Sequence, residues 1–169
     1  MPPDWPATAP PPLPPVVATI GYEGATLPAL VDALRAAGIT LLVDVRAAAR
    51  SRRPGFAKSR LAAGLSEAGI AYRHLPGLGT PADGRAAARA GRHAAMQTIF
   101  RAHLATAAAQ DELAVLTTLV SSERVCLLCF EAEPQHCHRL LVADALADAL
   151  AARAPITIRH LHPDPETAD

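Results

Sequence analysis

Short, almost wholly apolar segments alternate with segments of helical periodicity, and this alternation limits the fold more than any other feature. Residues 39–45 form one such apolar segment, which is typical of a strand buried on both faces of a parallel sheet. The segment before it has leucines and a valine at helical spacing, with Thr26 as a predicted N-cap and Gly38 as the predicted helix end. The pattern therefore predicts a strand, a helix and a second strand in succession.

The same alternation continues through the rest of the chain. Strands are predicted at residues 16–20, 39–45, 70–75, 124–130 and 156–160. Helices between successive strands imply a mostly parallel sheet of about five strands with helices on both faces, a three-layer α/β sandwich. Residues 81–92 are rich in alanine, arginine and glycine without a clear apolar stripe, so they are interpreted as either a mobile lid or a marginal helix.

The length of the chain sets its domain organisation. With 169 residues, 50% of them hydrophobic and 19% charged, the chain suffices for one well-buried domain, which we expect over residues 16–162. Residues 1–15 hold eight of the sixteen prolines and are expected to form a disordered or polyproline-like tail. A flexible tail is expected over residues 163–169.

The net charge and the cysteine content indicate which binding partners and which cell compartment we expect. The formal net charge is zero, so a nucleic-acid partner is disfavoured against a small anionic ligand. No apolar stretch approaches the roughly 20 residues needed to span a bilayer, and we expect no membrane partner. Three cysteines without a secretory leader indicate reduced thiols and a cytoplasmic protein. The oligomeric state is left open.

Polar side chains lie at or near the ends of four predicted strands. They are Tyr22 and Glu23 after the first strand, Asp44 and Arg46 at the second, Tyr72 and His74 on the third, and Cys129 and Glu131 at the fourth. Because the carboxyl ends of parallel strands open on one edge of a sheet, we expect these side chains to share a site.

The stretch from Cys129 to Arg139 concentrates most of the reactive groups. Cys137, His138 and Arg139 are predicted in the first turn of a helix, where free amides and the helix dipole favour an anion and lower the pKa of a thiol. The leading hypothesis is an enzyme with Cys129 or Cys137 as nucleophile, Glu131 or His138 handling protons, and Arg139 contacting the substrate anion.

Two other interpretations of the same stretch stay open. Cys129 and Cys137 form a thiolate pair that could bind a metal together with His136 or His138, although the spacing fits no standard zinc knuckle. We therefore assign no metal ligand and name no cofactor. In the purely structural interpretation, Cys137 packs as a small apolar residue and Arg139 pairs with an aspartate.

A basic loop over residues 46–60 contains no acidic residue. Its cations and Phe56 suit a phosphorylated or otherwise anionic small substrate; the alternatives are a noncatalytic module for a nucleotide or nucleic-acid end and a solvated surface loop. The predicted substrate-binding residues are Tyr22, Glu23, Asp44, Arg46, Ser51, Arg52, Lys58, Tyr72, His74 and Arg139.

Five segments of the sequence together resemble a bacterial family of unknown function, DUF488. They are residues 19–23, 42–46, 51–56, 69–79 and 129–139, and the resemblance runs from about residue 16 to residue 160. It implies an α/β domain with a polar pocket, and it implies no agreed reaction. The sequence departs from the family pattern at Thr80, where a second glycine is usual, and in the alanine-rich run after Arg46, where a proline is usual.

Overall fold

The strands form a single sheet in the order β3-β2-β4-β1-β5, with every neighbouring pair parallel. They are β1 (Val16–Gly21), β2 (Leu41–Asp44), β3 (Ala71–His74), β4 (Val125–Cys129) and β5 (Thr157–Leu161). The computed structural model describes residues 15–164, so residues 1–14 and 165–169, most of the two predicted tails, lie outside the described part.

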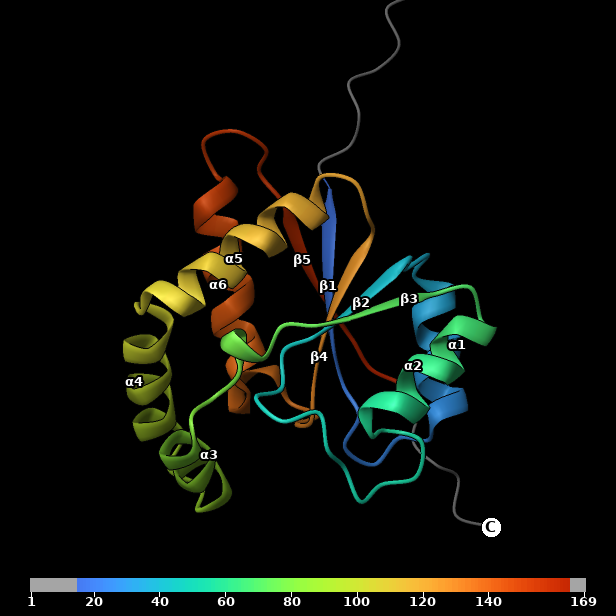
Figure 1. The fold of residues 1–169 in the computed structure, drawn as a ribbon, viewed down its shortest axis with the longest axis horizontal. Helices are drawn as coiled ribbons and strands as arrows, with labels where there is room; N and C mark the ends of the chain where they lie inside the picture. The colour runs from blue at the N-terminus through green and yellow to red at the C-terminus, as the bar shows by residue number, and fades with distance from the viewer. Residues whose placement is uncertain (1–14, 165–169) are drawn as a thin grey trace, which may run out of the picture.

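Helices cover both faces of this sheet (Figure 1). They are α1 (Leu27–Ala36), α2 (Lys58–Glu67), α3 (Ala82–Arg89), α4 (His93–Leu104), α5 (Ala107–Val120) and α6 (His138–Leu150). The first two pack on one face, and helices α4 to α6 pack on the other, with α3 against α4. The predicted α/β sandwich is thus confirmed, and most of segment 81–92 is helical. No helix within residues 15–164 is long and apolar enough to cross a membrane.

The apolar pattern of each strand follows its place in the sheet. Every residue of β2 and β4 is buried, because both strands lie inside the sheet and have helices on both sides. The edge strand β3 alternates exposed and half-buried residues along its whole length, and β5 does so up to its last residue, which is buried. Continuous apolar runs therefore mark the sheet interior, as expected for parallel strands.

The chain leaves two neighbouring strands toward opposite faces of the sheet. β1 and β4 are paired, and Gly21 lies opposite Cys129 at their carboxyl ends. The helix after β1 is α1, which packs on one face, whereas the helix after β4 is α6, which packs on the other. Such a divergence opens a crevice at the carboxyl ends, where α/β proteins bind ligands.

The first helix begins at the N-cap predicted from the sequence. The hydroxyl of Thr26 accepts a hydrogen bond from the backbone N–H of Ala29, at 3.2 Å. Replacing Thr26 with alanine is expected to lower the free energy of unfolding by about 1 kcal/mol, measured by urea denaturation. Thr98→Ala is the matched control, because the exposed Thr98 hydroxyl bonds only a carbonyl of its own helix. Equal losses in the two variants would contradict the capping role.

Candidate functional site

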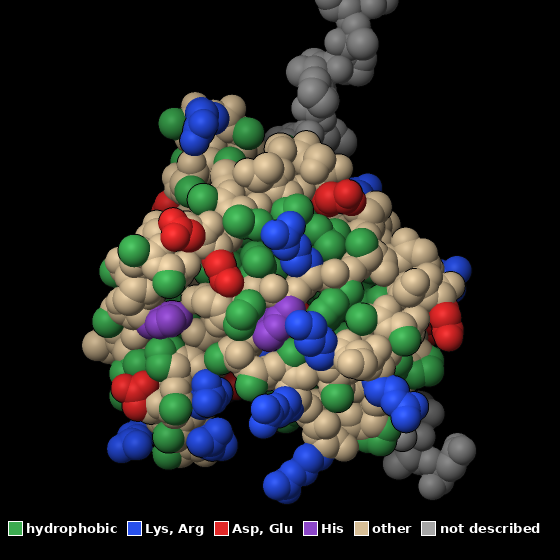
Figure 2. Space-filling view, in the orientation of Figure 1, with side chains coloured by type: hydrophobic (Ala, Val, Ile, Leu, Met, Phe, Trp, Pro, Cys, Tyr) green, Lys and Arg blue, Asp and Glu red, His purple; other side chains and the backbone are tan. Residues whose placement is uncertain are grey.

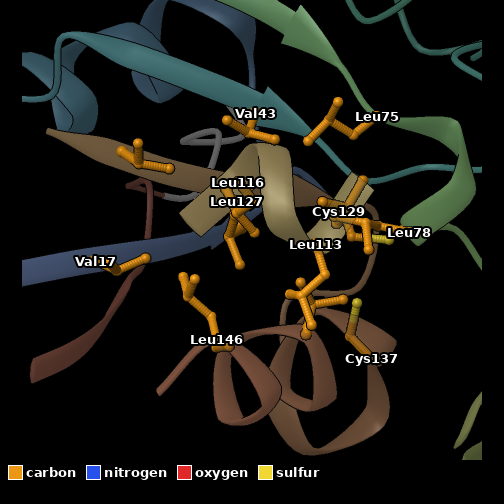
Figure 3. Close-up of a cluster of buried hydrophobic side chains, with 14 of the residues drawn as sticks. Val17, Val43, Leu75, Leu78, Leu113, Leu116, Leu127, Cys129, Cys137 and Leu146 are labelled. Carbon is orange, nitrogen blue, oxygen red and sulfur yellow. The ribbon is translucent and has the colours of Figure 1, made fainter. Parts of the chain in front are cut away.

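Two thiols and an imidazole meet at the end of β4. Cys129 is the last residue of that strand, and Cys137 and His138 stand at the start of α6. The Nδ1 atom of His138 lies 3.5 Å from the sulfur of Cys129 and 3.9 Å from that of Cys137. Figure 3 shows Cys129 and Cys137 in the apolar cluster between the sheet and α6. The structure thus brings together three of the four predicted catalytic residues.

The ring of His138 is held in one orientation. Its Nε2 lies 2.7 Å from the carbonyl oxygen of Val45, to which it donates, because a carbonyl can only accept. Phe100 packs beside the imidazole with ring centroids 5.1 Å apart. In the neutral ring the lone pair is therefore on Nδ1, the atom that faces both sulfurs.

Glu131, the fourth predicted catalytic residue, lies beside Cys129. Its Oε2 is 3.7 Å from the sulfur of Cys129. Burial, with a smaller contribution from the charge of Cys137, raises the pKa of Glu131 to about 7. The carboxyl group is thus suited to take up and release a proton near neutral pH.

The two thiols differ in acidity. The pKa of Cys129 is raised by its hydrogen bond with Cys137, by burial, and by the charges of Cys137 and Glu131. Burial alone would raise the pKa of Cys137, but hydrogen bonds with Cys129 and His138 and the charges of His138 and Arg139 lower it well below its usual value. The pKa of His138 is raised, because its interactions with Cys137 outweigh its burial. Without another cation, Cys137 and His138 favour a thiolate and an imidazolium.

Four of the predicted substrate-binding residues, three of them buried and Tyr72 half-buried, are joined in one hydrogen-bond network. Asp44 accepts two hydrogen bonds from the guanidinium of Arg46, at 2.8 and 2.7 Å, and one from the hydroxyl of Tyr72, at 2.5 Å. The same guanidinium donates to the hydroxyl of Tyr22, at 3.2 Å. These hydrogen bonds fix Asp44, Arg46 and Tyr72, which together shape the carboxyl end of β2. His74 joins them by binding the carbonyl of Arg46, at 2.7 Å.

Arg139 and Glu23 hold the loop after β4. The fully buried guanidinium of Arg139 donates to Thr19 and to the carbonyl oxygens of Glu131 and Ala132. Glu23 accepts a hydrogen bond from the N–H of Ala132, at 3.0 Å. The predicted anion contact by Arg139 finds no support in this placement, because the side chain faces the protein interior.

A pocket of about 350 Å³ opens beside the sulfur–imidazole cluster. Its lining includes five residues predicted from the sequence: Tyr22, Arg46, Cys129, Glu131 and His138. Three arginines that the predicted site lacks, Arg50, Arg85 and Arg89, also line it, together with Phe130 and His136. The ring of Phe130 is exposed, whereas that of His136 is stacked on His93, with centroids 4.2 Å apart. Basic side chains gather on the lower part of the face in Figure 2, over α3 and the loop after β2.

Sequence reasoning overlooked the contribution of α3. Arg85 and Arg89 are one helical turn apart, which places them on one face of that helix. The small alanines of this segment form no clear apolar stripe, so the spacing of the two arginines is the signal that points to a shared face. Arg50 belongs to the basic loop and is not among the predicted substrate-binding residues.

The remaining predicted residues lie elsewhere. Ser51 and Arg52 border a separate hollow between α1, α2 and the basic loop. Lys58 is exposed at the first turn of α2. Phe56 is fully buried with its ring stacked on Tyr22, at a centroid distance of 4.5 Å, so neither ring of this stack offers both faces to a ligand. The basic loop is thus divided between two hollows.

No curated protein and no solved structure matches the chain. The family model described as domain of unknown function DUF488 matches residues 26–146, which include β2, β3, β4 and the whole sulfur–imidazole cluster. That range is well over half of the sequence, and it confirms the resemblance seen in the ordered motifs. The chain belongs to the DUF488 family.

Proposed function

We propose that this protein is a zinc-dependent enzyme acting on a small anionic substrate, with Cys129, Cys137 and His138 as the metal ligands. Two thiolates and an imidazole are a donor set that zinc prefers. Three protein ligands would leave a fourth position for water or substrate, as in catalytic zinc sites. The arginine-lined pocket beside the cluster would hold the substrate anion.

The spacing of the three donor atoms carries this proposal. Zinc bound at about 2.3 Å from sulfur and about 2.05 Å from nitrogen, with tetrahedral angles, separates these two donors by about 3.6 Å. Nδ1 of His138 is 3.5 and 3.9 Å from the two sulfurs, and all three donor atoms lie within 4.8 Å of one another. The two nitrogen–sulfur distances therefore suit one tetrahedral ion held by all three residues.

The surroundings of His138 support the same assignment. Zinc-bound histidines usually donate their second N–H to a carbonyl or carboxylate, which fixes the ring and its tautomer. Nε2 of His138 donates to Val45 in that way. A bound cation would take the place of the proton that His138 otherwise keeps, and it would stabilise both thiolates.

Glu131 supports a catalytic role for the centre. Its carboxylate lies beside Cys129, one of the three residues that would hold the ion, and lines the pocket. A carboxyl group there would accept a proton from a bound water or substrate. The arginines would neutralise the negative charge of the substrate.

The cysteine-nucleophile hypothesis has weaker support. Cys129 lines the pocket, but the pKa of its thiol is raised. Cys137 has the lowered pKa, yet its side chain is only 3% exposed and does not line the pocket. Both residues are buried, at 5% exposure for Cys129 and 3% for Cys137, whereas a nucleophile must be open to its substrate.

Metal analysis of the purified protein tests the proposal. We expect about one zinc per chain by mass spectrometry of protein prepared under reducing conditions without chelators. Cys137→Ser and His138→Ala are expected to lower the zinc content at least tenfold, because each removes one of three ligands. Cys126→Ser is the matched control, since Cys126 is equally buried but packs on the opposite face of the sheet.

These measurements distinguish a zinc centre from a cysteine nucleophile. Metal-free protein that also fails to bind added zinc would overturn the proposal, and rapid alkylation of one thiol would then favour the nucleophile. Circular dichroism of each variant shows whether zinc loss reflects ligand removal or unfolding. Cobalt substitution tests the open position: azide should change the cobalt absorption spectrum, whereas an unchanged spectrum would mean a closed, structural site.

A further inference from the structure

The pocket lining combines an excess of positive charge with one uncovered aromatic ring. Arg50, Arg85 and Arg89 line it and are exposed, and Glu131 is the single carboxylate among its lining residues. Arg46 also lines the pocket, but its charge is balanced by Asp44. Three arginines are therefore placed to receive an anionic group of a ligand.

Phe130 supplies the aromatic surface. It is 44% exposed, and it is the one large hydrophobic side chain exposed to this degree among residues 15–164. Its ring meets Tyr22 edge to face, with centroids 5.3 Å apart and planes at 74°. This contact supports the ring from one side and leaves its remaining surface at the pocket uncovered.

The exposed phenyl ring of Phe130, which lines the pocket, offers a surface on which a ligand could stack. A flat ring stacked on it would bury apolar area on both partners, worth about 1–3 kcal/mol per base in nucleic-acid complexes. Aliphatic ligands gain less from such a surface, because they have no π face to stack. The exposed ring thus favours a ligand with a planar ring.

From these two features we infer that the pocket takes a small molecule bearing both a planar ring and an anionic group, of the nucleoside monophosphate class. The ring would stack on Phe130, and the phosphate would lie among Arg50, Arg85 and Arg89. This inference rests on the proposed function in one respect: it places the ligand beside the zinc ligands Cys129 and His138.

The size of the pocket agrees with a single nucleotide. Its volume of about 350 Å³ is at the lower end of the roughly 300–1,000 Å³ typical of small-molecule sites. A strand of nucleic acid would need a longer basic track, and the zero formal net charge of the chain does not favour one. Between a free nucleotide and a nucleic-acid end, the pocket favours the free nucleotide.

Calorimetric titration of the zinc-loaded full chain tests this inference. The probes are AMP and CMP, the two matching nucleosides, ribose 5-phosphate, and benzoate as an aromatic carboxylate. We expect at least one nucleotide to bind about tenfold more tightly than both its nucleoside and ribose 5-phosphate. Equal binding of ribose 5-phosphate would overturn the ring contact, and tighter binding of benzoate would overturn the nucleotide class.

Variants assign the two contacts to residues. Phe130→Ala should lower nucleotide affinity about tenfold while leaving ribose 5-phosphate unchanged. Arg89→Ala should lower the affinity for the nucleotide and for ribose 5-phosphate and leave the affinity for the nucleoside unchanged. Arg35→Ala, an exposed arginine on α1 on the other side of the sheet, is the matched control and should change neither.

Zinc content, measured on each sample, separates this inference from the proposed function. No nucleotide binding by protein that contains zinc would overturn the inference and leave the metal centre intact. Nucleotide binding by protein that takes up no zinc would overturn the metal centre and keep the ligand class.

Discussion

Replacing Gly21 with alanine is expected to lower the free energy of unfolding by about 3 kcal/mol or more. The new methyl carbon would lie 1.8 Å from the carbonyl oxygen of Glu131 and 2.6 Å from its carbonyl carbon. These are backbone atoms, and Arg139 binds that same oxygen. The loop after β4 would have to leave its place, which urea denaturation would detect.

A second glycine provides the control for this prediction. Gly64 lies within α2, where an added methyl group would meet only the end of the Leu27 side chain, at 2.8 Å. That side chain can turn aside, and alanine is favoured over glycine in a helix by about 1 kcal/mol. Gly64→Ala should therefore change stability little. Comparable losses in the two variants would show that the backbone at Glu131 does not pass closely over Gly21.

Asp44→Asn is expected to lower the free energy of unfolding by about 3–5 kcal/mol, because it leaves the guanidinium of Arg46 buried without its counter-charge. Asp44 is wholly buried and accepts hydrogen bonds from Arg46 and Tyr72. Burial tends to lower the pKa of Arg46, but Asp44 and Tyr22 raise it far above its usual value. The folded protein thus keeps this arginine charged, and an amide cannot balance that charge.

A double-mutant cycle checks the coupling. Asp44→Asn combined with Arg46→Met should cost less than the sum of the single changes by about 1–3 kcal/mol. Asp32→Asn, on the exposed side of α1, should stay within about 0.5 kcal/mol of the wild type. Strict additivity of the two changes would mean that each residue acts independently and would contradict the buried ion pair.

The sheet could be predicted because its signal is local. The fully apolar runs at β2 and β4 are the response of a sequence to burial on both faces, and Thr26 and Gly38 mark the ends of a helix by their own chemistry. Strand order carries no such signal. β4 pairs with both β1 and β2, and only the assembled sheet makes Gly21 the neighbour of Cys129.

The candidate site was predictable in its residue types and less so in its roles. Cys129, Glu131, Cys137 and His138 are close in sequence, so their proximity in space was expected. Whether Arg139 faces a ligand or the interior depends on carbonyl groups of the loop that it binds, and these have no distinctive sequence. The Asp44–Arg46 pair likewise acquires its structural role from Tyr72, on the adjacent strand.

The path of the chain between the two cysteines has a thermodynamic consequence. Phe130, Glu131 and His136 all belong to the stretch that joins Cys129 to Cys137, and all three line the pocket. An ion bridging the two sulfurs would close that stretch into a ring and restrict its motion. Occupancy of the pocket and of the metal position would then strengthen each other by the same factor, as reciprocal linkage requires. If the zinc proposal holds, protein without the ion would therefore bind the pocket ligand more weakly than protein with it.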